Sequence, residues 1–296
     1  MPYILGTNVA GIVQKLGPNV STFCVGDRVF GEADVNYPTP DMAGLQEFAI
    51  LDITATAKTP PNLTNDQVAT LPVNVVTSFI TLFTPSGFNF PSPFMKSSNA
   101  DVSSFHNKSE TLIIIGGGSN VGKLAIQLAK LAEIGTIIAI ASGQREHELK
   151  GLGATHVIDR NSASIPAQAR DIVESNRLTH VYDCVNWTYE LALDILTSDR
   201  SSQLATLHPI TEDMEQMIRQ KRPQCQIKII IGMSTNLEPF EKQFWQDLPQ
   251  WLEQGKIALQ KFQIIEGLDA RKVNAALDSY EDGKAVLQAV VHPNHD

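Results

Sequence analysis

Hydrophobic residues form short continuous runs between residues 111 and 232, and amphipathic segments separate these runs. The runs are "TLIIIG", "GTIIAIA", "THVID", "THVYDCV", "SQLATLH" and "QIKIIIG". Segments 121–132, 145–153 and 164–176 have the three-to-four-residue spacing of helices with one apolar face. Apolar strands alternating with such helices are typical of a parallel sheet that is covered on both faces. The pattern predicts an α/β fold with a Rossmann-type, doubly wound parallel sheet of about six strands.

The first part of the chain has a different pattern. Residues 1–58 contain the β-type runs "ILGTNVAGIVQKLG", "DRVFGEA" and "LQEFAILD", separated by Gly, Pro and Asp. These runs predict a small, turn-rich antiparallel β unit. Residues 65–83 are predicted to be helical. Residues 84–110 are rich in Ser, Asn and Pro, which predicts a long surface loop beside a binding cleft.

Composition narrows the class of protein. The chain has 296 residues, of which 43% are hydrophobic, and 23 Lys and Arg face 32 Asp and Glu for a net charge of −9. This balance argues against a surface built for nucleic acid or anionic lipid. The sequence has no signal segment and no run of 18 apolar residues, so we expect no membrane span and a cytoplasmic location. The expected partner is a small molecule.

The stretch "GGGSNVGKL" between the first run and the first helix fits two unrelated phosphate-binding loops. Gly117, Gly122 and Lys123 match the GxxxxGK pattern of a nucleoside triphosphate loop, and Asp183 follows a later strand as a metal ligand would. However, Leu124 stands where a Ser or Thr hydroxyl must bind Mg²⁺. Leu124 also falls on the apolar helix face, which predicts that Lys123 points to solvent.

A dinucleotide loop fits the same stretch better. Gly116 and Gly118 allow a tight turn after the strand, Ser119 or Asn120 caps the helix, and Gly122 lets the helix approach the strand closely. A pyrophosphate would bind the backbone N–H groups at the helix N-terminus. The remaining alternative is a purely structural glycine turn. The expected cradle comprises Gly116, Gly117, Gly118, Ser119, Asn120, Val121 and Gly122.

The end of the second strand indicates which dinucleotide binds. An NAD site usually has Asp or Glu here, whereas this chain has Ser142, Gly143, Gln144 and Arg145. A hydroxyl and a guanidinium suit a 2′-phosphate, so we expect NADPH as the cofactor. Alternatively, Arg145 is a solvated residue at the start of a helix.

An ordered set of motifs runs along nearly the whole chain: "PYILGTNVAGIVQKLGPNVSTFCVGDRVFG", "AGLQEFAI", "LPVNVVTSFITLF", "LIIIGGGSNVGKLAIQLAKLAEIGTIIAIAS", "KGLGATHVIDR", "LPQWLEQGKI" and "GLDARKVNAALDSYEDGKAV". Together these motifs resemble the medium-chain dehydrogenase/reductase superfamily, in particular its zinc-independent quinone and enoyl reductases. The Ser/Asn-rich insert resembles that of fungal trans-acting enoyl reductases, which are often linked to polyketide pathways. The resemblance implies a reduced GroES-like domain from residues 1–75 and 237–296, and a Rossmann domain from residues 76–236 with the 84–110 insert.

The resemblance also implies an activity. It is NADPH-dependent reduction of a C=C bond conjugated to a carbonyl, on an apolar unsaturated substrate and with a polyketide synthase as a partner. Thr77 would approach the nicotinamide or the phosphates, unless it is a helix-packing threonine. The backbone of Ile231, Gly232 and Met233 would bind the carboxamide. No residue is assigned as catalytic, and Asp183 is expected to order the neighbouring loop.

Two departures from the family pattern matter. Zinc-dependent relatives have a His and an acidic residue where this chain has Thr7 and Asn8, and the position near Val73 also lacks a cysteine. We therefore expect no metal. No two of the histidines have paired ligand spacing, and the cysteines are scattered. They are His106, His147, His156, His180, His208, His292 and His295, with Cys24, Cys184 and Cys225.

The second departure is that the chain begins at the first matching motif, so we expect an N-terminally shortened catalytic domain. This favours an alternative in which the protein keeps the fold but is not a redox enzyme, and instead binds, regulates or catalyses a rearrangement or cyclisation. If redox chemistry is retained, we expect Phe88, Phe90, Phe94 and Met95 to line the substrate cleft. These four side chains would otherwise form a small satellite core or a dimer contact.

Overall fold

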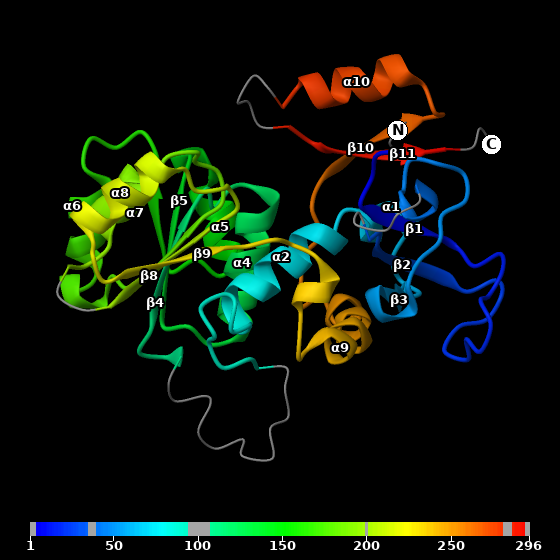
Figure 1. The fold of residues 1–296 in the computed structure, drawn as a ribbon, viewed down its shortest axis with the longest axis horizontal. Coiled ribbons are helices and arrows are strands. Elements are labelled where there is room, and N and C mark those ends of the chain that lie inside the picture. The colour runs from blue at the N-terminus through cyan, green and yellow to red at the C-terminus, as the bar shows by residue number, and fades with distance from the viewer. Residues whose placement is uncertain (1–3, 35–39, 94–106, 199–200, 281–285, 294–296) are drawn as a thin grey trace. The chain divides into compact units, whose positions relative to one another are not determined.

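The computed structural model describes residues 4–34, 40–93, 107–198, 201–280 and 286–293, which belong to two compact units (Figure 1). Unit 1 comprises residues 1–73 and 241–296, and unit 2 comprises residues 74–240. The chain therefore enters unit 2 once and returns to unit 1 once.

The core of unit 2 is a six-stranded parallel sheet. Its strands are β4 (Thr111–Ile115), β5 (Thr136–Ala141), β6 (His156–Asp159), β7 (His180–Asp183), β8 (Ser202–Thr206) and β9 (Cys225–Ile229). They lie in the order β6-β5-β4-β7-β8-β9, and every neighbouring pair is parallel. The predicted doubly wound sheet is confirmed. Its order reverses between β4 and β7, and ligands of open α/β sheets bind outside the carboxyl ends of the strands at such a point.

Helices cover both faces of this sheet. They are α2 (Pro72–Phe83), α4 (Asn120–Leu131), α5 (Glu146–Leu152), α6 (Ile165–Ile172), α7 (Glu190–Ile195) and α8 (Glu212–Lys221). Helices α6, α7 and α8 lie together on one side of the sheet (Figure 1), while α4 packs on β4, β5 and α5. Sequence spacing explains α4, because Leu124, Ala125 and Leu128 fall on one face and all three are buried.

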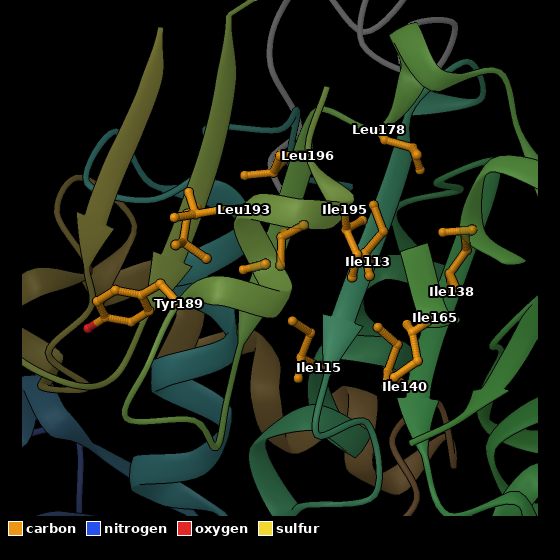
Figure 2. Packing of buried hydrophobic residues seen from close by; sticks show 14 of the residues in the cluster. Ile113, Ile115, Ile138, Ile140, Ile165, Leu178, Tyr189, Leu193, Ile195 and Leu196 are labelled. Atoms are coloured by element: carbon orange, nitrogen blue, oxygen red, sulfur yellow. The ribbon is translucent and has the colours of Figure 1, made fainter. Parts of the chain in front are cut away.

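Alternate strand residues form the core beneath α6, α7 and α8. Ile113 pairs with Ile138 and Ile115 with Ile140 in the β4–β5 register, and all four side chains belong to this core (Figure 2). The intervening residues Leu112 and Ile114 are also fully buried, which explains why β4 has no polar position after Thr111. Burying each such side chain contributes about 1.5–3 kcal/mol, so this sheet is the rigid support for the loops at its edges.

Unit 1 is smaller and mainly β-rich. Strands β1 (Asn8–Ile12), β2 (Arg28–Glu32) and β3 (Thr56–Lys58) form an antiparallel sheet, and β10 (Phe262–Glu266) pairs with β11 (Gln288–His292) in parallel. The helices are α1 (Asn65–Ala69), α9 (Glu241–Glu253) and α10 (Ala270–Asp278). Phe30 of β2 meets Trp245 of α9 edge to face, with ring centroids 6.1 Å apart. An antiparallel β unit is confirmed for the first part of the chain.

Two local predictions differ from the structure. The run "LQEFAILD" does not form a strand, and Phe48 and Ile50 within it are 70% and 58% exposed. Among the described strands none pairs with this run, and the N–H of Ile50 instead donates to the carbonyl of Asp41 at 2.8 Å. The predicted helix over 65–83 consists of α1 and α2, separated at Thr70 and Leu71. Pro72 begins α2, where the missing N–H of proline costs no hydrogen bond.

The prediction that Phe88 and Phe90 line the substrate cleft is wrong. Both side chains are buried, they contact each other, and their ring centroids lie 5.2 and 4.8 Å from that of His180. His180 is the first residue of β7, so these rings lie at the amino edge of the sheet, opposite its carboxyl edge. They form the small satellite core that was the alternative. Phe94 and Met95 lie outside the described residues.

Candidate functional site

The turn after β4 is built from glycines that the backbone requires. Gly116 has φ +80°, a conformation that residues with a Cβ rarely adopt. A Cβ atom on Gly122 would lie 2.3 Å from the carbonyl oxygen of Gly116, and one on Gly117 would lie 2.9 Å from Cβ of Ala139. The chain therefore returns close to β4 as α4 begins, as the dinucleotide pattern predicts.

The N-terminus of α4 presents backbone donors beside this turn. Ser119 is the N-cap, and its Oγ accepts a hydrogen bond from the N–H of Gly122 at 3.0 Å. The N–H of Ser119 donates to the carbonyl of Gly116. Within the described residues, the N–H groups of Gly118 and Val121 have no acceptor. These donors and the helix dipole favour an anion at this point.

A nucleoside triphosphate loop is disfavoured by the neighbouring side chains. Leu124 is fully buried, as its position on the apolar face predicts, and has no metal-binding group. Lys123, however, does not point to solvent: its side chain is only 13% exposed, and Nζ forms an ion pair with Glu148 of α5. Lys123 therefore ties α4 to α5.

Arg145 lies over the glycine turn. A Cβ atom on Gly118 would lie 3.0 Å from Cδ of Arg145, and Nη1 of Arg145 is 3.3 Å from Oε2 of Glu148. Ser142 begins the short 3-10 helix that carries Arg145, and its side chain makes no capping bond. Burial raises the pKa of Glu148, but Lys123 and Arg145 outweigh burial and hold that pKa below its usual value. The two cations therefore share one carboxylate beside the glycine turn.

A second arginine, Arg160, lies at the carboxyl edge of the sheet and was not identified from the sequence. Arg160 follows β6, is exposed, and donates its backbone N–H to the carbonyl of Ala141 at 2.7 Å. Asp159 pairs with Ala141 in the β5–β6 register, so Arg160 continues beside Ser142. The neighbouring Asp159 carboxylate accepts from the N–H groups of Gly143 and Asn161. The strand "THVID" is recognisable in the sequence, but its register against β5 is not.

The residues expected near the nicotinamide, Thr77 and residues 231–233, lie together beside the half of the sheet that is formed by β7, β8 and β9. Gly232 contacts Thr77 so closely that a Cβ atom on Gly232 would lie 1.8 Å from Oγ1 of Thr77. The carbonyl of Ile231 accepts from the N–H of Met233 and from Nδ2 of Asn236, both at 3.0 Å. Oγ of Ser78 donates to the carbonyl of Val121 at 3.0 Å, so α2 holds Thr77 close to the glycine turn.

Asp183 at the end of β7 orders the loop that follows it. Its carboxylate accepts from the N–H groups of Val185 and Asn186 and from Nδ2 of Asn186, at 2.9 to 3.2 Å. Burial raises the pKa of Asp183, and these donors oppose the shift. With its oxygens occupied by the loop, Asp183 is not poised to remove a proton from a ligand.

The residues at the expected zinc position do not fit a metal ion. Nδ2 of Asn8 donates to the carbonyl of Ala69 at 2.9 Å, and Oδ1 of Asn8 accepts from the N–H of Val73 at 3.0 Å. The Asn8 amide thus joins β1 to the end of α1. Across the described ranges, no group of three or more His, Cys, Asp or Glu residues is arranged to hold a metal.

In the part of the chain that the structure describes, no helix combines the length and the apolar character that crossing a bilayer requires.

Comparisons with known proteins cover both units. Residues 1–60 match the family model described as alcohol dehydrogenase GroES-like domain, and residues 120–207 match that of zinc-binding dehydrogenase. The chain is 33% identical over 186 residues to the trans-enoyl reductase himH of Aspergillus japonicus, covering 62% of this chain and 50% of the relative. It is 30% identical to lovC of Aspergillus terreus, described as the enoyl reductase component of lovastatin nonaketide synthase, covering 61% and 48%. The matches thus span about half the length of these relatives.

Similarity in structure extends over the whole chain. The quinone oxidoreductase of Pseudomonas syringae pv. Tomato DC3000 superposes with a TM-score of 0.71 at 20% identity, covering 99% of this chain and 83% of that one. The fold is therefore shared beyond the segments that align with himH and lovC. The solved structure shows the fold alone, whereas the two family matches, with the glycine turn and the sheet order that they predict, show that the chain belongs to the medium-chain dehydrogenase/reductase superfamily.

Proposed function

We propose that the chain binds NADPH at the carboxyl edge of the unit 2 sheet and reduces a C=C bond conjugated to a carbonyl. The observation that carries this proposal is the position of Arg145 directly over the glycine turn, with the N-terminus of α4 beside it. A phosphate-rich dinucleotide is the ligand class that this combination of backbone donors and cations suits best.

The pyrophosphate would bind the N–H groups of Gly118 and Val121 at the start of α4. Both follow β4, the strand beside which the strand order reverses. Side chains at Gly117 and Gly122 would displace the turn, so the glycines keep the backbone within reach of the phosphates.

The choice of NADPH rests on the charges after β5 and β6. The end of β5 has Ser142 and Arg145 where an NAD site usually has a carboxylate, and Arg160 lies beside them. Glu148 already compensates part of the charge of Lys123 and Arg145, yet the cations outnumber it. A 2′-phosphate would supply the missing negative charge.

Reduced nicotinamide, when bound, supplies the hydride that the reduction requires. The chain's own part is to hold the ring. Thr77 and the backbone of residues 231–233 are brought together at the half of the sheet opposite Arg145, where they would orient the carboxamide. Met233 and Ile231 would shield the ring from water.

The substrate class is inferred from the relatives. himH is a trans-enoyl reductase, and lovC is the enoyl reductase component of a polyketide synthase. We infer that this chain acts on an apolar α,β-unsaturated acyl group, and that a polyketide synthase delivers the acyl group as a thioester.

Titration calorimetry with NADPH and NADH tests the cofactor, and oxidation of NADPH with a short α,β-unsaturated acyl thioester tests the reaction. We expect tight binding of NADPH, weaker binding of NADH, and thioester-dependent oxidation. Equal affinity for both cofactors would contradict the role of Ser142 and Arg145. Binding of NADPH without oxidation in the presence of any enoyl thioester would indicate a cofactor-binding protein that is not a reductase.

A further inference from the structure

Two aromatic rings from different loops stack face to face at the carboxyl edge of unit 2. Trp187 follows β7 and His208 follows β8, and their ring centroids are 3.8 Å apart with planes inclined by 28°. One face of Trp187 therefore lies on the imidazole. The Trp187 side chain nonetheless remains 65% exposed, which is unusual for an aromatic residue of this size.

Both loops are held in place by buried groups. Asp183 binds the backbone of Val185 and Asn186 just before Trp187. Tyr189 is fully buried, and its hydroxyl points away from the apolar cluster (Figure 2) and donates to the carbonyls of His208 and Pro209, at 3.0 and 3.3 Å. The stacked pair is therefore pre-organised, and its exposed ring face costs little entropy when a ligand covers it.

The pair is adjacent to the glycine turn. The N–H of Cys184 donates to the carbonyl of Ile115, and Val185 packs on Gly116, where a Cβ atom would lie 2.5 Å from Cγ1 of Val185. Strands β7 and β8 continue the sheet on the side of β4 that is opposite to β5 and β6. Trp187 and Arg145 therefore lie on opposite sides of the point where the strand order reverses.

We infer that the Trp187–His208 pair is a stacking platform for the nicotinamide half of the dinucleotide. This inference rests on the proposed function. If the 2′-phosphate lies at Ser142 and Arg145 and the pyrophosphate lies on α4, the second half of the cofactor must extend over β7 and β8. One ribose separates its ring from the pyrophosphate, so the planar ring reaches the exposed aromatic face. Trp187 is in this view a positioning residue for the cofactor.

Fluorescence tests this inference directly, because the chain has only three tryptophans. Trp245 and Trp251 are 3% and 4% exposed in unit 1, whereas Trp187 is open to solvent in unit 2. Reduced nicotinamide mononucleotide and adenosine 2′,5′-bisphosphate represent the two halves of NADPH. We expect the nicotinamide fragment to quench the emission of Trp187, because its absorption overlaps that emission, and the adenosine fragment to leave it unchanged.

Two variants distinguish the contribution of ring stacking to affinity from the quenching of Trp187 emission. Trp187→Ala should lower the affinity for the nicotinamide fragment about threefold to tenfold, as the loss of one aromatic contact predicts. The affinity for the adenosine fragment, measured by calorimetry, should not change. Trp187→Phe should lose the quenching but keep the affinity. Quenching by the adenosine fragment, or unchanged nicotinamide affinity in Trp187→Ala, would overturn the inference while leaving the proposed function intact. If neither fragment binds, the proposed function fails and the platform with it.

Discussion

Single residues decide the character of the proposed phosphate site, because backbone N–H groups would do most of the binding there. Gly116, Gly118 and Gly122 contribute no side-chain chemistry, but a Cβ atom on Gly122 would clash with the backbone of the turn, and the proposal needs that backbone to lie close to the ligand. Ser119 fixes the first turn of α4, and Arg145 adds the charge. The shape of the glycine turn and the charge of Arg145 can therefore be tested by separate substitutions.

Replacing Arg145 with alanine tests charge. The substitution should weaken the binding of NADPH by about 1.5–3 kcal/mol, or about tenfold to a hundredfold, because it removes a charge-assisted hydrogen bond. The binding of NADH should change much less. Calorimetry with both cofactors measures the difference. Arg219→Ala is the matched control, because Arg219 is an exposed arginine that pairs with Glu215 on α8, away from the glycine turn. An equal loss for both cofactors would show that Arg145 does not bind the 2′-phosphate.

Replacing Gly122 with alanine tests shape. The new Cβ would clash with the carbonyl oxygen of Gly116, so we expect the free energy of unfolding to fall by about 1–3 kcal/mol. Gly151→Ala in α5 is the control, because a Cβ atom at residue 151 would meet no other atom within 4 Å and φ is not positive. It should stabilise the protein by about 0.5–1 kcal/mol. Urea unfolding of both variants gives the comparison, and a neutral Gly122→Ala would contradict the close approach.

At the scale of elements, β11 is attached to α1 through a charged contact. Nε2 of His292 lies 2.8 Å from Oδ1 of Asp66, and Nδ1 lies 3.2 Å from Oε1 of Glu266 on β10. The hydrogen bond to Asp66 is the main cause that raises the pKa of His292, and Glu266 adds to it while burial opposes it. When it is protonated, the imidazole on β11 thus pairs with carboxylates on α1 and on β10.

This contact makes stability depend on pH. Because the pKa is higher in the folded state, the stabilisation is fully present below the unfolded-state pKa of about 6.5 and is lost as pH rises through the folded-state pKa. Urea unfolding at several pH values should show this slope in the native protein and a smaller slope in His292→Gln. His147→Gln, at an exposed position of α5, should keep the native slope. An unchanged slope in His292→Gln would show that the contact contributes nothing.

At the scale of the whole molecule, the sequence predicted what depends on local pattern and missed what depends on pairing between distant segments. The strands of unit 2 were found because each is a short run rich in apolar residues that is separated from the next by an amphipathic segment, and Leu124 was placed inside because its helix has one apolar face. The run at Phe48 and Ile50 has equally apolar residues, but it lacks a partner strand. Strand β3 has only three residues, so its pattern is too short to recognise.

In the candidate site too, residues that depend on local pattern were predicted and residues that depend on distant pairing were missed. The glycine turn and Arg145 are visible in the sequence because they follow strands. Arg160 was missed because its place beside Ser142 depends on the β5–β6 register, and Phe88 and Phe90 were misplaced because their contact with His180 is a long-range one. Lys123 was expected in solvent because its partner Glu148 lies on another helix.

Independence from metal is a prediction for the molecule as a whole. Asn8 uses both ends of its amide on the backbone of Ala69 and Val73, so the position that would hold zinc is occupied by structural hydrogen bonds. Purified protein should contain no stoichiometric zinc by elemental analysis, and chelation should change neither NADPH oxidation nor the melting temperature. Loss of both with EDTA, restored by zinc, would contradict this.

The contact between Gly116 and Gly122 has a genetic consequence. The obstacle to a side chain at residue 122 is a main-chain oxygen, which every amino acid at residue 116 would also carry. No exchange at Gly116 can therefore suppress a defect caused by substitution of Gly122. Suppressor mutations should instead map to side chains that set the distance of α4 from the sheet, such as Ile126 and Ala139, which both border Gly117.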